Sequence, residues 1–154
     1  MLAAAVTLPL AAEAVAAVLP RAASAEGGAV PAVVEFRVGA VGRRPDAVYI
    51  NSERDYRDPR NLSVVLEPMA ARQLERGYGP AESWRGKRVT VRGDVRRVRI
   101  LFAENGKATG FYYFQFHLSV TDPGRFRLDG KFTPGAEAEA AEAPPAPALV
   151  PQSP

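Results

Sequence analysis

Two long segments in which apolar and polar residues alternate limit the fold of this chain more than any other feature. Valines at positions 89, 91 and 95 share one phase of the first segment, and polar residues occupy the other. In the second segment, residues 111–121, the apolar phase holds Tyr112, Phe114, Phe116, Leu118 and Val120. Asn105-Gly106 lies between the two segments and is typical of a two-residue hairpin turn. The pattern therefore predicts a long antiparallel hairpin with one apolar face.

Shorter patterns precede this hairpin. Three strands are predicted around Val34, Phe36 and Val38, around Val48 and Ile50, and over residues 62–66. Residues 69–76 contain helix-favouring Ala, Arg, Gln, Leu and Glu, and glycines follow at positions 77 and 79, so a short helix is predicted there. Phe126 and Leu128 predict a short last strand.

Details of the long strands give further expectations. Gly93 lies on the inward phase, where a small residue allows a strongly curved strand to approach its neighbours. After Arg96-Arg97 the apolar phase changes to Val98 and Ile100, which predicts a bulge at that point. Val91, Phe114 and Phe116 lie on inward phases, so we expect all three to be nearly fully buried.

Three strands, a helix and two long strands follow the order of the OB-fold, a five-stranded Greek-key barrel. The predicted fold class is therefore all-β with one short helix, and the helix closes one end of the barrel. The domain is expected to span residues 33–131, with disordered segments at both termini.

Five segments carry a closer resemblance. They are residues 48–51 (Val-Tyr-Ile-Asn), 55–59 (Asp-Tyr-Arg-Asp-Pro), 61–66 (Asn-Leu-Ser-Val-Val-Leu), 86–95 (Gly-Lys-Arg-Val-Thr-Val-Arg-Gly-Asp-Val) and 120–123 (Val-Thr-Asp-Pro). Over about residues 33–128 the chain resembles the bacterial OB-fold nucleic-acid-binding-like domain, which occurs in many exported proteins and beside some nuclease domains. The resemblance implies the same barrel, because the family is defined by its fold more than by one activity.

The N-terminal segment is similar to a secretory signal. Residues 2–19 are mostly apolar, and Ala23 and Ala25 are small residues at the positions that a signal peptidase reads. Residues 1–25 are therefore predicted to be a signal peptide cleaved before Glu26, followed by a linker over residues 26–32. The mature protein is therefore expected to be periplasmic or secreted and to have no membrane span. The alternative is an alanine-rich leader on a cytoplasmic protein.

Charge is divided unevenly along the chain. Residues 33–131 contain 19 basic and 12 acidic residues, a balance of +7. Residues 132–154 contain three glutamates and no basic residue, a balance of −3, and are rich in Ala and Pro, which predicts a disordered tail. A basic body indicates affinity for polyanions, and the alternative is an arginine-rich surface that serves solubility.

Much catalytic chemistry is excluded by composition. The chain has no cysteine and one histidine, His117, so thiolate chemistry and multi-histidine metal sites are ruled out. No hydrolase, zinc-protease, phosphate-loop or dinucleotide motif occurs. Glu53, Asp55 and Asp58 alternate with arginines and are expected to form local ion pairs rather than a calcium loop. We therefore expect a protein that is not an enzyme and uses no cofactor or metal.

The residues of a binding face can still be named. OB-folds bind nucleic acid or sugar across their second and third strands and adjoining loops, and single-strand binders combine cations with stacking aromatics. The candidate ligand-binding residues are Arg43, Arg44, Tyr49, Arg92, Arg96, Arg97, Arg99, Phe111, Tyr113 and His117. They predict a groove for single-stranded nucleic acid or another polyanion. The alternative is that the arginines form a solvated strand face and the aromatics cover a barrel edge.

A second function class also agrees with the sequence. An exported envelope domain that contacts a protein or a glycan, with no role in nucleic-acid binding, would also fit the predicted signal peptide. The two classes differ in whether the arginines share a groove with Tyr49 and Tyr113.

Overall fold

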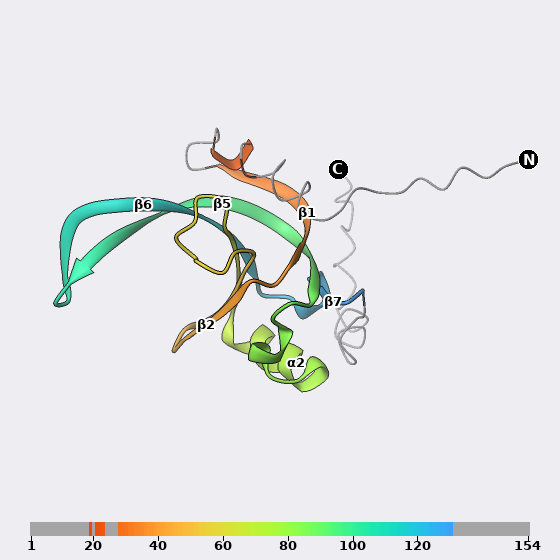
Figure 1. The fold of residues 1–154 in the computed structure, drawn as a ribbon. Coiled ribbons are helices and arrows are strands. Elements are labelled where there is room, and N and C mark those ends of the chain that lie inside the picture. The colour runs from red at the N-terminus through yellow and green to blue at the C-terminus, as the bar shows by residue number, and fades with distance from the viewer. Residues whose placement is uncertain (1–18, 20, 24–27, 131–154) are drawn as a thin grey trace, which may run out of the picture.

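The computed structural model describes Leu19, residues 21–23 and residues 28–130 (Figure 1). The predicted acidic tail and most of the predicted signal peptide lie outside the described residues. Two described residues of the predicted signal peptide, Leu19 and Ala22, are buried against the hydrophobic core. The first strand begins at Ala29, so the latter part of the predicted linker is strand.

The described residues form one seven-stranded sheet with a short α-helix. The strands are β1 (Ala29–Arg37), β2 (Ala40–Arg44), β3 (Ala47–Asn51), β4 (Leu62–Leu66), β5 (Arg88–Glu104), β6 (Lys107–Val120) and β7 (Phe126–Leu128). The order is β1-β5-β6-β4-β3-β2, with β7 paired to β5. All pairs are antiparallel except β4 with β6. The prediction of a β fold with one short helix is confirmed, whereas the sheet is not closed by strand pairing and the five-stranded barrel stays a prediction.

The helix α2 (Pro68–Tyr78) confirms the helix predicted over residues 69–76. Proline is tolerated at its first turn because the backbone N–H groups there have no partner within the helix. The helix ends at Tyr78 and is followed by Gly79, whose φ of 81° is readily adopted only by glycine. Ala70, Ala71 and Leu74 face the core from this helix.

The core lies between α2 and the inner face of the sheet. Its largest buried side chains are Trp84, Phe126, Ile50, Leu62, Leu66, Leu74 and Leu118. Trp84 belongs to the 3-10 helix η1 (Ala81–Trp84), and its ring centroid lies 5.4 Å from that of Phe126. The indole N–H donates to the carbonyl of Gly79 at 3.1 Å, so the polar atom of this large side chain is paired. The helix covers one end of the sheet, away from the β5–β6 hairpin (Figure 1).

The hairpin turn is confirmed by the backbone of Asn105 and Gly106, where φ is 50° and 77°. The bulge predicted at Arg96-Arg97 is wrong. Strands β5 and β6 keep one register from Val95 opposite Leu118 to Leu101 opposite Tyr112, and the register shifts only between Leu101 and Ala103. The apolar phase changes because the strands leave the sheet near Arg97, and a ribbon outside the core has no inner face to enforce one pattern.

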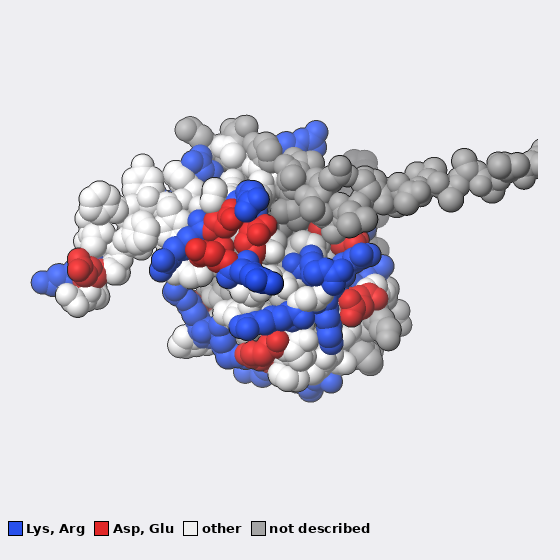
Figure 2. Space-filling view, viewed as in Figure 1, with Lys and Arg blue, Asp and Glu red and all other residues white. Residues whose placement is uncertain are grey.

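We call residues 97–115 the arm, because over this range β5 and β6 pair only with each other. The arm projects away from the rest of the sheet (Figure 1). In the view of Figure 2 it presents mostly uncharged side chains, with charged groups at its tip, where Glu104 and Lys107 flank the turn.

The arm also corrects the predicted burial. Val91 is fully buried as predicted, but Phe116 is only partly buried and Phe114 is 38% exposed. Phe114 lies beyond the core, where the guanidinium carbon of Arg97 is 3.5 Å from the centroid of its ring. Gly93 does face inward, and a Cβ built there would lie 2.9 Å from Cδ2 of Leu118.

Candidate functional site

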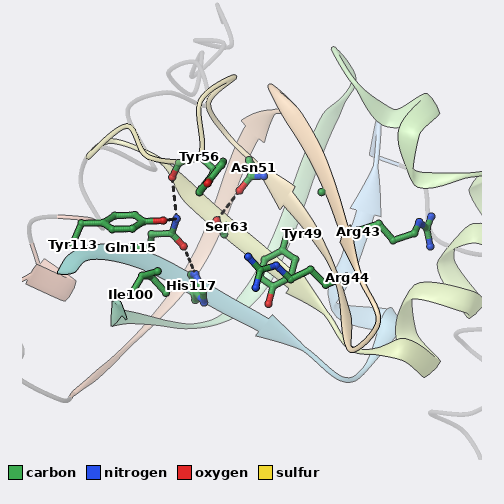
Figure 3. Close-up of a pocket in the computed structure, with 11 residues that line it drawn as sticks. Arg43, Arg44, Tyr49, Asn51, Tyr56, Ser63, Ile100, Tyr113, Gln115 and His117 are labelled. Carbon is green, nitrogen blue, oxygen red and sulfur yellow. Dashed lines mark hydrogen bonds between the residues drawn. The ribbon is translucent and has the colours of Figure 1, made fainter. Parts of the chain in front are cut away.

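A cavity of about 250 Å³ opens on the outer face of the sheet (Figure 3). Its lining comes from β2, β3, the loop after β3, β4, β5 and β6. The lining residues are Gly42, Arg43, Arg44, Tyr49, Asn51, Tyr56, Ser63, Ile100, Tyr113, Gln115 and His117. None of them is acidic, so the cavity is bordered by positive and neutral groups.

The strand register brings these residues to one face. Asn51 pairs with Ser63, and Ser63 pairs with His117, so the three lie in a row across β3, β4 and β6. Residues opposite one another in a sheet point to the same side, and residues two apart in a strand do so as well. Gln115 and Tyr113 therefore follow His117 along the same face.

A buried polar network forms the floor of the cavity. Ser63 Oγ donates to Asn51 Oδ1 at 2.6 Å, and Asn61 Nδ2 donates to Asn51 Oδ1 at 3.2 Å and to Ser63 Oγ at 3.0 Å. Asn61 Oδ1 accepts from the backbone N–H of Glu53 at 3.1 Å, which fastens the loop after β3 to the sheet. Buried polar groups need such partners because an unpaired one costs free energy.

Gln115 connects the side chains on the β6 side of the cavity with the loop after β3. Its Nε2 donates to the carbonyl of Tyr56 and to Tyr113 Oη, both at 3.1 Å, and its Oε1 lies 2.9 Å from His117 Nε2. Because Oε1 can only accept, His117 Nε2 carries the hydrogen of that bond. Burial lowers the pKa of His117, so the ring is neutral near pH 7 and Nδ1 is an acceptor. Burial also raises the pKa of Tyr113, which keeps its hydroxyl protonated.

Arg44 and Tyr49 form the side of the cavity built by the β2–β3 hairpin. The guanidinium carbon of Arg44 lies 6.0 Å from the centroid of the Tyr49 ring, within the range of a cation–π contact. The rings of Tyr49 and His117 are in edge-to-face contact, with their centroids 6.1 Å apart. A cation and two aromatic rings therefore lie together beside the floor.

Arg43 lines the cavity but directs its charge elsewhere (Figure 3). It stands on the opposite phase of β2 from Gly42 and Arg44. Its guanidinium binds Glu75 at 2.5 Å and Glu82 at 3.2 Å, and the hydrogen bond to Glu75 is the largest cause of the raised pKa of Arg43. This predicted binding residue instead joins β2 to α2 and η1.

The arginines of β5 divide between the two faces. Arg96 pairs with His117 in register, so Arg96 and Arg92 lie on the face of the cavity, although neither lines it. Arg97 and Arg99 lie on the opposite face. The guanidinium carbon of Arg97 is 3.5 Å from the centroid of the Phe114 ring, and that of Arg99 is 5.5 Å from the centroid of the Tyr112 ring. Phe111 is 74% exposed near the tip of the arm. Of the predicted binding residues, the structure thus gathers Arg44, Tyr49, Tyr113 and His117 around one cavity.

Sequence reasoning missed Asn51, Tyr56, Ser63, Ile100 and Gln115 as site residues. Asn51, Ser63 and Gln115 are polar strand residues, which suggest a solvated face, whereas all three are buried. The signal that points to them is the pair of asparagines, Asn51 and Asn61, at the two ends of the long polar loop after β3. Asparagine amides fasten loops by bonding to nearby backbone groups.

One of the predicted local ion pairs, between Asp58 and Arg60, is present in the same loop. Arg60 contacts Asp58 at 2.9 Å, and this hydrogen bond is the largest cause that lowers the pKa of Asp58 to about 2. Asp55 accepts from the backbone N–H of Arg57 at 2.9 Å. In the view of Figure 2, acidic and basic side chains are mixed over the middle of the molecule. Among the described residues, no group of three His, Cys, Asp or Glu side chains is placed to hold a metal ion.

The composition of the lining would suit a flat ring beside an anionic group. Aromatic walls, a buried amide network and one cation lie together, and no nucleophile is paired with a base in the cavity.

Searches against protein-family models and curated proteins give no match for this chain. Among the described helices, none is long and apolar enough to cross a membrane.

Proposed function

We propose that the sheet is a five-stranded OB-type barrel in which β1 and β2 are two halves of one bent first strand. Two residues, Val38 and Gly39, join these halves, which stand at the two ends of the strand order. The N–H of Gly39 donates to the carbonyl of Asn51 at 2.9 Å, beside the β2–β3 pairing. The parallel pairing of β4 with β6 fits the same arrangement. The proposal extends the resemblance to bacterial OB-fold nucleic-acid-binding-like domains.

On this barrel, we propose that the face of β3, β4 and β6 binds single-stranded nucleic acid without catalysing a reaction. The observation that carries the proposal is the cavity that holds Tyr49, Tyr113 and His117 beside Arg44, with no acidic residue in its lining. Single-strand binders stack bases on aromatic rings and neutralise phosphates with nearby cations. OB-folds bind their ligands across the second and third strands, which correspond to β3 and β4 in this barrel.

Exposed arginines extend this face on both sides of the cavity. Arg44 lies on β2, and Arg92 and Arg96 lie on β5 across the sheet. A strand that crosses β3, β4 and β6 between them would meet cations at both ends. Such a path supports binding that is driven by phosphate charge and tolerant of sequence.

The second candidate is an exported envelope domain that contacts a protein or a glycan. The exposed apolar residues of the arm favour it, because contiguous apolar surface often marks an interaction site. These residues are Leu101, Phe102, Phe111, Tyr112 and Phe114. The predicted periplasmic or secreted location also favours this second candidate, whereas the basic balance of residues 33–131 favours the first.

Titration of a fluorescently labelled single-stranded oligonucleotide with the full chain at low salt tests the main proposal. Binding should weaken as salt increases, with a log–log slope of about −0.7 for each phosphate neutralised on a single strand. A duplex of equal length is the control and should bind more weakly, because its bases cannot reach the aromatic rings. The absence of binding at micromolar protein would favour the envelope domain.

A further inference from the structure

The cavity contains a buried hydrogen-bond donor that has no acceptor among the described residues. Asn51 is only 5% exposed, and its side chain lines the cavity. Asn61 Oδ1 accepts from a backbone N–H, so Nδ2 of Asn61 must face Asn51 and Ser63. The atom of Asn51 that meets them is therefore Oδ1, which also accepts from Ser63 Oγ. This leaves Asn51 Nδ2 without a partner in the described part of the chain.

An unpaired buried amide N–H group is costly, so its position favours a ligand that brings an acceptor. The other polar groups of the lining restrict what this ligand can be. His117 Nδ1 is an acceptor, and the hydroxyl of Tyr113 can donate because its oxygen accepts from Gln115. A ring that has both acceptors and donors on its edge matches this set.

The shape of the cavity agrees with one planar ring. Tyr49, Tyr113 and His117 provide aromatic surfaces, and Ile100 pairs with Tyr113 on the same face. The volume of about 250 Å³ is below the range of about 300–1,000 Å³ typical of sites for whole small molecules. A single base fits such a site, with its sugar and phosphate near Arg44.

We infer that the cavity is a subsite for one unstacked nucleobase, whose acceptor edge takes a hydrogen bond from Asn51 Nδ2. The inference rests on the proposed function and adds to it a place where one base of the strand leaves the stack. The rest of the strand is held through its phosphates. The subsite therefore distinguishes a strand with bases from one without, whereas the arginines interact only with the phosphate charge.

The test compares a short homothymidine strand with a strand of the same length whose sugars all lack bases. Both carry the same phosphate charge, so the ratio of their dissociation constants isolates the contribution of the bases. We expect the base-bearing strand to bind the full chain roughly fivefold to 100-fold more tightly, as stacking of one base on aromatic side chains implies.

Two variants then locate the contribution of the base. Asn51→Asp keeps both acceptor contacts of the floor and removes the donor, so the ratio should fall by roughly fivefold or more. Its added charge weakens both strands alike and cancels in the ratio. Tyr113→Ala removes one wall without touching the floor and should also lower the ratio. Tyr112→Ala, the neighbouring tyrosine on the opposite face of the arm, is the matched control and should leave the ratio unchanged.

Each outcome decides a separate point. If neither strand binds, the proposed function is wrong. If both strands bind equally tightly, the base subsite is wrong while binding through phosphates stands. If Asn51→Asp melts like the parent and keeps the full ratio, Asn51 is not the donor. Should Asn51→Asp fail to fold, an unchanged ratio in Tyr113→Ala would overturn the inference by itself.

Discussion

Gly39 packs directly against the backbone of Glu53. A Cβ built on Gly39 would lie 2.5 Å from the carbonyl carbon of Glu53 and 2.7 Å from its oxygen. This contact places the junction of β1 and β2 against the start of the loop that contributes Tyr56 to the cavity. The bend between β1 and β2 is therefore stabilised by close backbone packing, which leaves no room for a side chain at position 39.

Replacing Gly39 with alanine should destabilise the protein by about 1–3 kcal/mol or more, because backbone atoms must move to admit the methyl group. Gly42→Ala is the matched control, since the nearest atom to a Cβ there is Tyr49 Cβ at 3.8 Å, an ordinary contact. Urea unfolding of the two variants measures the difference. Equal stability of Gly39→Ala and the parent would contradict the observed junction.

Phe126 and Phe114 should respond very differently to truncation. Phe126 is fully buried against Trp84, so Phe126→Ala should cost about 3–5 kcal/mol through lost burial and the cavity it leaves. Phe114 lies on the arm and is 38% exposed, so Phe114→Ala should cost less than about 1 kcal/mol. Denaturant titrations of the two variants make the comparison. A large loss of stability in Phe114→Ala would contradict this exposure and would indicate that the arm packs against another surface in solution.

Arg44 and Arg43 are adjacent in sequence and should have separate roles. Arg44→Gln should make the log–log salt slope of oligonucleotide binding shallower by about 0.7, because one phosphate contact is lost. Arg43→Gln should lower stability, since it removes the partner of Glu75 and Glu82, and should leave the slope nearly unchanged. Arg76→Gln, an exposed change on α2, serves as the charge control. A slope that changes equally in all three variants would mean that only net charge matters.

Stability should depend on pH through the one histidine of the chain. Burial lowers the pKa of His117 below its ordinary value of 6.5, so the unfolded chain binds a proton more readily than the folded one. The contribution is complete above pH 6.5 and is lost as the pH falls from there toward the folded pKa. The slope of the unfolding free energy in this window should not exceed about 1.4 kcal/mol per pH unit.

Unfolding free energies measured at closely spaced pH values test this expectation. The parent should lose stability between pH 6.5 and the range where carboxyl groups titrate. His117→Gln should give a nearly flat profile over the same window, because no other side chain of the sequence has an ordinary pKa there. A parent profile as flat as that of the variant would show that His117 is as accessible to protons folded as unfolded.

Processing gives a further expectation. The intact mass of protein from its native host should correspond to residues 26–154, because Ala23 and Ala25 suit a signal peptidase. Such cleavage would also remove Leu19 and Ala22, which are buried in the full chain. The uncut protein should therefore melt at a higher temperature than the processed form. Full-length protein found only in the cytoplasm would contradict export.

The sequence alone was sufficient for the elements whose signals are local. The helix at Pro68–Tyr78, the strand at Leu62–Leu66 and the turn at Asn105-Gly106 follow from residue periodicity and turn chemistry, which act over a few neighbouring residues. The same patterns placed Tyr49, Tyr113 and His117 among the candidate site residues.

Tertiary structure alone decided which of the candidates meet. Arg43 and Arg44 differ by one position, yet alternation in β2 and the nearness of Glu75 and Glu82 send their side chains to different places. Phe114 is exposed because the hairpin continues beyond the strands that would cover it. Asn51 and Ser63 became part of a cavity only through pairing with His117 across three strands and through the loop fastened by Asn61. Local patterns determine which way a side chain alternates, but the register between distant strands and the extent of the sheet determine what it meets.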